Sequence, residues 1–230
     1  MRFVLLMLAL VACGACGDDG AAVDASITVD IDNGTCGAEL RFTGEYIDWD
    51  QDGGFCGIFD AAFASGADTL STAPNGRFDT CIDRAAAQVV YQVTPSATAS
   101  QCTDPQSTYP LPTIAVASNA VINAGGFWSG RNFTVARQAS LGVTLDPAKA
   151  HVFVHVDGTP RAVAVAAAHD APQANAATTW AAGDTGHEVF FPNVDVGGGT
   201  TMVSVTGGAI GTGSIPVAAG KITSVSLIAN

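Results

Sequence analysis

The sequence predicts an all-β protein of 230 residues, and three observations indicate this fold class. Residues that favour exposed helices are scarce, because only 3 of the 21 acidic residues are Glu and only 2 of the 9 basic residues are Lys. Apolar and polar residues alternate in short runs, as they do in strands with one buried face. These runs recur roughly every 8–12 residues with Gly-rich turns between them, a spacing typical of β-sandwiches.

The predicted strands of the first half precede a loop-like stretch at 94–112, which is rich in Ser, Thr and Pro. The sequence Ala73-Pro74-Asn75-Gly76 separates two of these strands, and Asn-Gly pairs favour tight turns. A further apolar run follows the loop-like stretch. The segments predicted in this half are 40–45, 55–64, 69–72, 77–82, 89–93 and 114–122.

The alternation restarts after residue 139, so we expect a domain boundary at 138–142. Valines alternate with two histidines and a phenylalanine over 151–156, and Asp157-Gly158-Thr159-Pro160 then makes a turn. The segments predicted in this half are 151–156, 162–168, 189–194, 200–205 and 222–228. We therefore expect two tandem Greek-key-type β-sandwich domains, at 34–138 and 139–230, after a signal peptide and a short tether.

Two motifs resemble a known family. The sequence Thr72-Ala73-Pro74-Asn75-Gly76-Arg77-Phe78 resembles the turn-Gly-Arg-Phe motif of carboxypeptidase regulatory-like domains, which share a transthyretin-like β-sandwich. The sequence Val189-Phe190-Phe191-Pro192-Asn193-Val194, with the glycines and alternating Thr and Val that follow it, is similar to the end of the same domains. The resemblance covers 36–93 and 143–230, and the 94–112 insertion departs from it. It implies a non-catalytic spacer or binding module.

Composition excludes two classes of partner. The formal net charge is −12, with 9 Lys plus Arg against 21 Asp plus Glu. Duplex binding depends on basic residues that neutralise phosphates, so we expect no nucleic-acid partner. Electrostatic docking on anionic lipid is disfavoured for the same reason. Hydrophobic residues make up 48 % of the chain, which is enough to build a folded core.

The amino terminus predicts export. Residues 1–12 begin with a charged Arg2 and continue with an apolar stretch that is far shorter than the roughly 20 residues of a transmembrane helix, as in a signal peptide. The sequence Leu10-Val11-Ala12-Cys13 resembles the lipobox cut by the bacterial lipoprotein signal peptidase, which implies that Cys13 carries a diacylglycerol and becomes the new amino terminus. The alternative is an ordinary secreted protein cleaved near Ala15.

The lipid on Cys13 would make the bilayer a partner, because two or more acyl chains give a stable anchor where one does not. Residues 13–33 are small and acidic, as expected of a tether. Gly14 stands where an Asp resembles the inner-membrane retention signal of enterobacterial lipoproteins. The predicted location is therefore the bacterial cell envelope, on the outer membrane.

Four cysteines in the predicted folded part indicate two disulfides, since an even set is typical of exported domains. They are Cys36, Cys56, Cys81 and Cys102. Among the three possible connectivities we favour Cys56–Cys81 with Cys36–Cys102. Spacings of 20, 25 and 21 residues lack the close pairs of a zinc site. Cys16 is left over.

An acidic loop matches the first half of a calcium-binding loop. Asp48, Asp50 and Asp52 alternate before Gly53, and such carboxylates converge on one ion in EF-hand-type sites. The twelfth position, normally Glu, is Phe59 here, and the nearest acid is one step late. The alternative is a solvated hairpin loop without an ion. Apart from calcium at this loop, no cofactor is expected.

Two other residue types suggest chemistry. His151 and His155 share one face of a predicted strand at about 13 Å from each other, too far apart for one metal ion, so histidines at a surface or interface are favoured. The alternative is a metal-dependent hydrolase that uses His155. Three tryptophans, Trp49, Trp128 and Trp180, stack on sugars if exposed, but core or rim positions are the favoured reading.

These observations predict a non-catalytic structural or binding module on the cell envelope, with an unidentified envelope protein or glycan as partner. The first alternative is a calcium- or carbohydrate-binding adhesin, and the second is the hydrolase. A covalent Lys–Asn cross-link at Lys149 is a further hypothesis, which predicts the loss of one ammonia, about 17 Da, from the intact mass.

Overall fold

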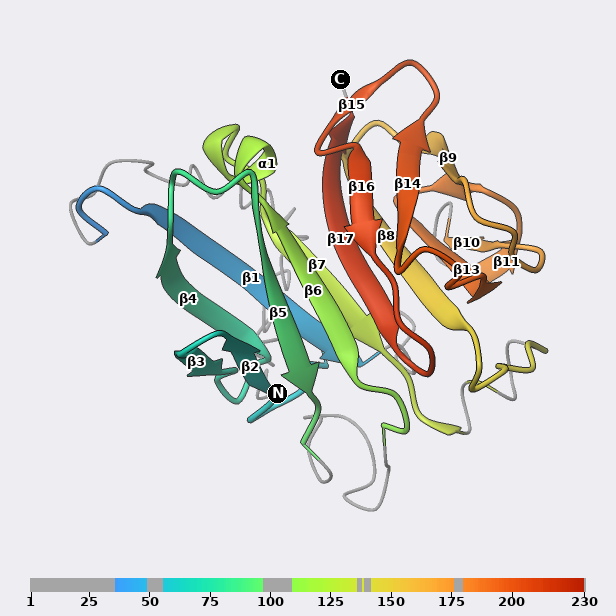
Figure 1. The fold of residues 1–230 in the computed structure, drawn as a ribbon, viewed down its shortest axis with the longest axis horizontal. Helices are drawn as coiled ribbons and strands as arrows, with labels where there is room; N and C mark the ends of the chain where they lie inside the picture. The colour runs from blue at the N-terminus through green and yellow to red at the C-terminus, as the bar shows by residue number, and fades with distance from the viewer. Residues whose placement is uncertain are drawn as a thin grey trace, which may run out of the picture.

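The computed structural model describes residues 36–48, 56–96, 109–135, 138, 142–175 and 180–229. Almost all regular structure in these residues is strand, which confirms the all-β prediction. The strands form three sheets, of three, ten and four strands (Figure 1). A short helix, α1 (Asn119–Asn123), follows the sixth strand.

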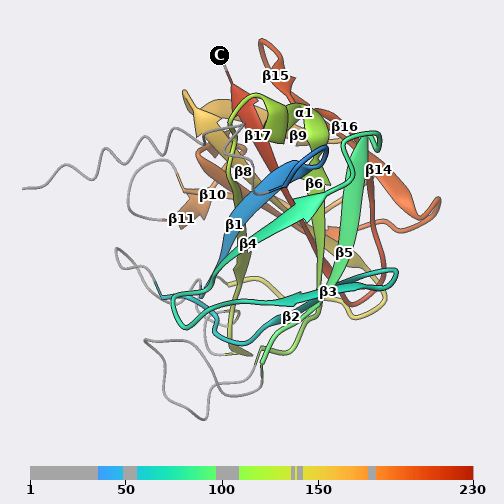
Figure 2. The same ribbon diagram turned by 90° about the vertical axis from the view of Figure 1, so that its left-hand side faces the viewer.

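The first half of the chain is a sandwich of two sheet layers. One layer has the order β4-β1-β7, and the other is the β6-β5-β2-β3 part of the ten-stranded sheet (Figure 2). Aromatic side chains fill the space between them, with the Phe63 ring centroid 4.9 Å from Phe78 and 5.8 Å from Trp128. The strands are β1 (Leu40–Asp48), β2 (Ala62–Ser65), β3 (Asp68–Ser71), β4 (Arg77–Ile82), β5 (Gln88–Thr94), β6 (Thr113–Ser118) and β7 (Trp128–Asn132).

The second half is also a sandwich, and its core is aliphatic. The β11-β10-β13-β8-β17 part of the ten-stranded sheet faces a four-stranded sheet of order β12-β9-β14-β16. Val152, Val154, Val203 and Ile215 are among the side chains buried between the layers. The strands are β8 (Ala150–Gly158), β9 (Arg161–Val165), β10 (Gln173–Asn175), β11 (Trp180–Ala182), β12 (Thr185–Gly186), β13 (Glu188–Val194), β14 (Thr200–Val205), β15 (Ala209–Ile210), β16 (Gly213–Pro216) and β17 (Ile222–Ala229).

Strand β17 joins the two sandwiches into one sheet. It pairs in parallel with β6 of the first half and with β8 of the second, and the register aligns Val225 with both Val116 and Val154. The predicted boundary at 138–142 lies between β7 and β8, but the ten-stranded sheet passes from one half to the other. The expectation of two tandem Greek-key domains is therefore not confirmed, and the boundary stays a prediction.

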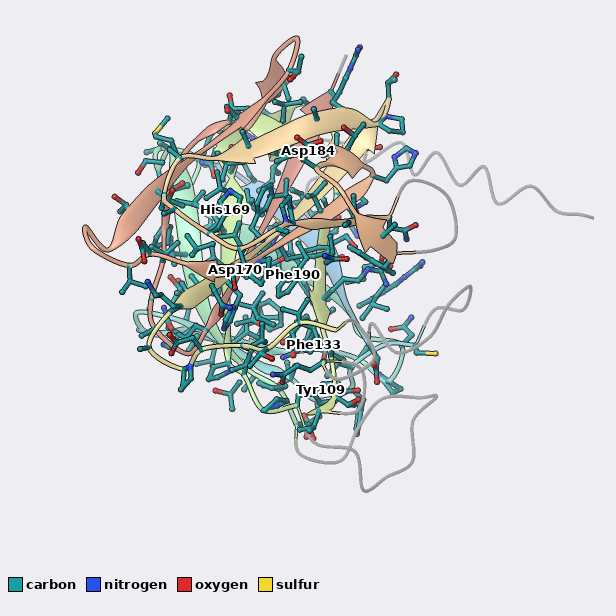
Figure 3. The ribbon with its side chains drawn as sticks, turned by 90° about the vertical axis from the view of Figure 1, so that its right-hand side faces the viewer. Tyr109, Phe133, His169, Asp170, Asp184 and Phe190 are labelled. Atoms are coloured by element: carbon teal, nitrogen blue, oxygen red, sulfur yellow. A yellow bond between two sulfur atoms is a disulfide. The ribbon has the colours of Figure 1, made fainter. Side chains whose placement is uncertain are left out.

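The connection between the halves packs on the second sandwich. Phe133 lies against Phe190 with ring centroids 5.5 Å apart, and both are visible on the same side of the molecule in Figure 3. Phe153 and Ile222 complete this third buried cluster, and Leu145 packs against it. The face of the ten-stranded sheet that points away from the second core is thus covered at this end.

The turn at Asn75-Gly76 forms as predicted, but it connects two sheets. β3 pairs with β2 in the large sheet, whereas β4 pairs with β1 in the small one. Gly76 has φ 73°, and the backbone N–H of Arg77 donates to the Asn75 side chain. The predicted strand over 55–64 is shorter than expected, because Asp60 adopts φ 54° and β2 begins only after it.

One disulfide pairing differs from the prediction. Cys36 bonds to Cys81, so the expected Cys56–Cys81 pair is wrong, and with it the Cys36–Cys102 pair. The register of β1 with β4 explains the choice, because Cys81 lies opposite Arg41 and thus beside the segment that leads into β1. Cys56 is also disulfide-bonded, and its partner lies outside the described residues.

Candidate functional site

A row of polar residues crosses the large sheet in the second half. Ser226, His155, Glu188 and Asn175 are cross-strand neighbours on β17, β8, β13 and β10. Side chains alternate along a strand, and Val154 belongs to the second core. The four side chains therefore point away from that core, toward the first sandwich.

Strand β7 brings polar groups of the first sandwich onto this row. Trp128 points into the first core, so Ser129 and Arg131 lie on the opposite face of β7. The backbone N–H of Ser129 donates to Ser226 Oγ at 2.9 Å, and Arg131 Nε donates to Glu188 Oε1 at 2.6 Å.

Glu45 completes this arrangement from β1, where it lies opposite Ser129 in the parallel pair with β7. Ser129 Oγ donates to Glu45 Oε1 at 3.3 Å, and the exposed Arg77 lies 4.0 Å from Glu45 Oε2. We refer to this set as the junction cluster: Glu45, Ser129, Arg131, His155, Asn175, Glu188 and Ser226. It contains two of the three Glu residues of the chain.

The ion pair at its centre is largely shielded from water. The side chains of Arg131 and Glu188 are 20 % and 6 % exposed. The other oxygen of Glu188 accepts a hydrogen bond from Asn175 Nδ2 at 3.3 Å. Removing one partner of such a pair leaves a buried charge without compensation, whereas removing both can be neutral. Each half of the chain therefore supplies one charge that the other half needs.

Burial shifts two pKa values in opposite directions. Desolvation raises the pKa of Glu45, while the nearby Arg131 cation and the Ser129 hydroxyl lower it. Desolvation also lowers the pKa of His155, although the Glu188 carboxylate acts in the opposite direction. The His155 Nδ1 atom is closed to solvent and has no hydrogen-bond partner among the described residues. The neutral imidazole is thus the form that this position favours.

The acidic loop is placed only in part. Asp48 is fully buried at the end of β1, and its carboxylate accepts a hydrogen bond from the Tyr109 hydroxyl. Its backbone N–H donates to Cys56 O at 2.7 Å, which closes the base of the loop. Asp50 and Asp52 lie outside the described residues, so calcium binding stays a prediction.

His151, the other histidine of β8, is a buried structural residue. His151 is fully buried, and its Nδ1 accepts the backbone N–H of Asn193 at 3.2 Å, which places its proton on Nε2. Burial lowers its pKa to about 4. In the part of the chain that the structure describes, no group of three or more His, Cys, Asp or Glu residues is placed to hold a metal ion.

The remaining predicted residues have separate places. Trp128 is buried in the first core, and Trp180 packs against the Phe133 cluster, whereas Trp49, Cys13 and Cys102 lie outside the described residues. Lys149 forms an ion pair with Asp195, which raises the lysine pKa. The partner that the structure gives the Lys149 amine is a carboxylate and not an Asn side chain, and the cross-link stays a prediction.

Sequence reasoning missed the junction cluster. Arg131 and Glu188 are 57 residues apart and belong to different predicted domains, so no spacing rule connects them. The available signal was compositional, since two of the three Glu residues of the chain lie next to or within apolar runs at Glu45 and Glu188. Comparisons with protein-family models, with curated proteins and with solved structures find no match. Among the described residues, no helix has the length and apolar character needed to cross a membrane.

Proposed function

We propose that the protein is a lipid-anchored component of the bacterial cell envelope and acts as a non-catalytic structural or binding module. The anchor rests on the Leu10-Val11-Ala12-Cys13 sequence and the acidic tether that follows it. The module rests on one structural observation: β17 pairs with both β6 and β8, so that two sandwiches share a sheet. Two sandwiches that share one sheet at the end of a tether suit a spacer or a scaffold that presents a binding surface.

The contacts of the junction cluster support a structural role for its ionisable groups. Glu188 is engaged by Arg131 and Asn175, and Glu45 by Ser129. Acid–base catalysis needs a carboxylate or imidazole within reach of a substrate proton. Here both carboxylates are engaged by protein groups, Glu188 by the contact with Arg131 between the two sandwiches, and the His155 Nδ1 atom is closed to solvent. This favours a module over the hydrolase alternative.

The anchor is tested on the full chain expressed in a bacterium that processes lipoproteins. The wild-type protein should fractionate with membranes, and its intact mass should correspond to a chain that starts at Cys13 with added lipid. Reduction should add about four hydrogens, as expected for two disulfides. Cys13→Ser should move the protein to the soluble fraction, whereas the matched control Cys16→Ser should leave it on the membrane. An unlipidated mass for the wild type would overturn the proposal.

The adhesin alternative is favoured by the loop whose base is closed between Asp48 and Cys56. If the loop binds calcium, millimolar calcium should raise the melting temperature of the wild type but not of Asp50→Ala, since extracellular sites bind in the millimolar range. Asp68→Ala on the exposed strand β3 is the matched control. An unchanged wild-type melting temperature would remove this alternative.

A further inference from the structure

The junction cluster contains a titratable group whose charge acts between the two halves of the chain. His155 belongs to β8 of the second sandwich, and it lies opposite Glu188 on one side and Ser226 on the other. Both of these neighbours bind β7 of the first sandwich, through Arg131 and through the backbone of Ser129. A positive charge on His155 therefore acts directly on the two residues, Glu188 and Ser226, that bind β7.

The charges around His155 come from several elements. Glu188 on β13 and Asp157 on its own strand favour a protonated imidazole, whereas Arg131 on β7 and the neighbouring His187 disfavour it. Glu45 on β1 also belongs to the cluster, but it is bound by Ser129 and lies near Arg77. The facing residues of β17 and β10 are the uncharged Ser226 and Asn175. Arg131 is the one facing charge in this set that belongs to the first sandwich and carries the same sign as a protonated His155.

We propose that the junction cluster is an acid-sensitive joint, in which protonation of His155 weakens the contact of β7 with the second sandwich while both sandwiches stay folded. The protonated imidazole competes with Arg131 for Glu188 and repels the guanidinium across the junction. Its Nδ1 then carries a proton at a site closed to solvent, where the described structure offers no acceptor. These effects oppose the junction contacts and leave the aliphatic second core untouched.

Hydrogen exchange on the full chain, measured by mass spectrometry from pH 7 to pH 4.5 and corrected for the intrinsic exchange rate, tests this joint. The peptide that contains β7 should lose protection at Ser129, whose backbone N–H bonds to Ser226 of the second sandwich, as the pH falls. The peptides that contain β4 of the first sandwich and β14 of the second should keep their protection. A loss in the β4 or the β14 peptide at the same pH would mean that a whole sandwich unfolds and would overturn the proposal. Unchanged protection of β7 across the range would overturn it as well.

Two variants assign the effect to His155. In His155→Gln, β7 should keep its protection down to the lowest pH, while the control His169→Gln, at a partly exposed site in a different part of the second half, should behave as the wild type. In Arg131→Met, the loss of β7 protection between pH 7 and pH 4.5 should be smaller than in the wild type, because the guanidinium that the protonated imidazole competes with and repels is gone. The same loss of β7 protection with falling pH in His155→Gln, or an undiminished loss in Arg131→Met, would refute the role of His155.

Discussion

Arg131 of β7 donates a hydrogen bond to Glu188 of β13 across the junction of the two sandwiches. The pair differs from the ion pair of Arg41 with Asp79, whose side chains are 32 % and 51 % exposed. Exposed pairs contribute little because water screens them, whereas shielded pairs cannot lose one partner without a large penalty. Arg131 and Glu188 therefore make the two halves depend on each other.

Replacing one partner of this pair should destabilise the protein strongly. Arg131→Met leaves Glu188 shielded from water without its guanidinium, and we expect a loss of about 3–5 kcal/mol of unfolding free energy at neutral pH. The double variant Arg131→Met with Glu188→Leu should lose much less, since no unpaired charge remains. Urea unfolding of both variants measures the difference.

The exposed pair provides the control for this measurement. Asp79→Ala should cost less than about 1 kcal/mol, because Arg41 stays in contact with water. Equal losses in Arg131→Met and Asp79→Ala would contradict the structural role of the junction pair. A double variant less stable than Arg131→Met would contradict it too.

A methyl group at Gly57 should prevent the close contact of two backbone segments. A Cβ atom there would lie 1.9 Å from the backbone carbon of Asn75, which cannot move without breaking the turn before β4. We expect Gly57→Ala to lower the melting temperature by many degrees, or to prevent folding. Gly197→Ala is the matched control, because nothing lies within 4 Å of its Cβ position. Similar melting temperatures for the two variants, followed by circular dichroism, would contradict the close approach.

The buried His151 should make the fold less stable in acid. Its pKa is lowered from 6.5 to about 4, so the unfolded chain binds a proton that the folded chain does not bind between these values. Stability should therefore be fully present above pH 6.5 and decrease as the pH falls toward 4. At about 1.36 kcal/mol per pKa unit, this residue accounts for about 3 kcal/mol.

The His151→Asn variant isolates this contribution, because an amide oxygen can accept the Asn193 backbone N–H in place of Nδ1. Urea unfolding at pH 7 and pH 4.5 should show a smaller decrease for the variant than for the wild type. His155 contributes a decrease of the same sign in both proteins, so the difference between them belongs to His151. Equal decreases would mean that His151 is not neutral in the folded chain at low pH.

Alternation predicted the strands whose two faces meet different surroundings. In Thr200–Val205 the side chains alternate between solvent and the second core, and both valines of this segment lie at the buried positions that the sequence pattern predicts. Alternation could not predict that β17 pairs with β6 and β8, because the partners of a parallel strand depend on the path of the chain in space. Short strands such as Thr185–Gly186 carry too few residues to show a period.

The junction cluster could not be predicted from the sequence because its residues meet across neighbouring strands. His155 was considered with His151 along one strand, where their separation excluded a shared metal ion, but the polar residues beside it are on adjacent strands. Cross-strand register decides which polar residues meet, and it depends on the whole sheet. The same register decided the disulfide, by placing Cys81 beside the entry to β1.

The Cys36–Cys81 disulfide should contribute a measurable part of the stability of the first sandwich. It closes a loop with a sequence separation of 45 residues, and such a cross-link restricts the unfolded chain, which typically stabilises the folded state by about 2–4 kcal/mol. The double variant Cys36→Ser with Cys81→Ser should lose this amount in urea unfolding and leave no unpaired thiol at either position. Cys16→Ser is the matched control for loss of a cysteine from the tether. Because the bond also fixes the segment before β1 to β4, hydrogen exchange of β1 should rise in the double variant more than that of β8. A loss below about 1 kcal/mol, with β1 exchange unchanged, would mean that the sandwich holds this segment without the bond.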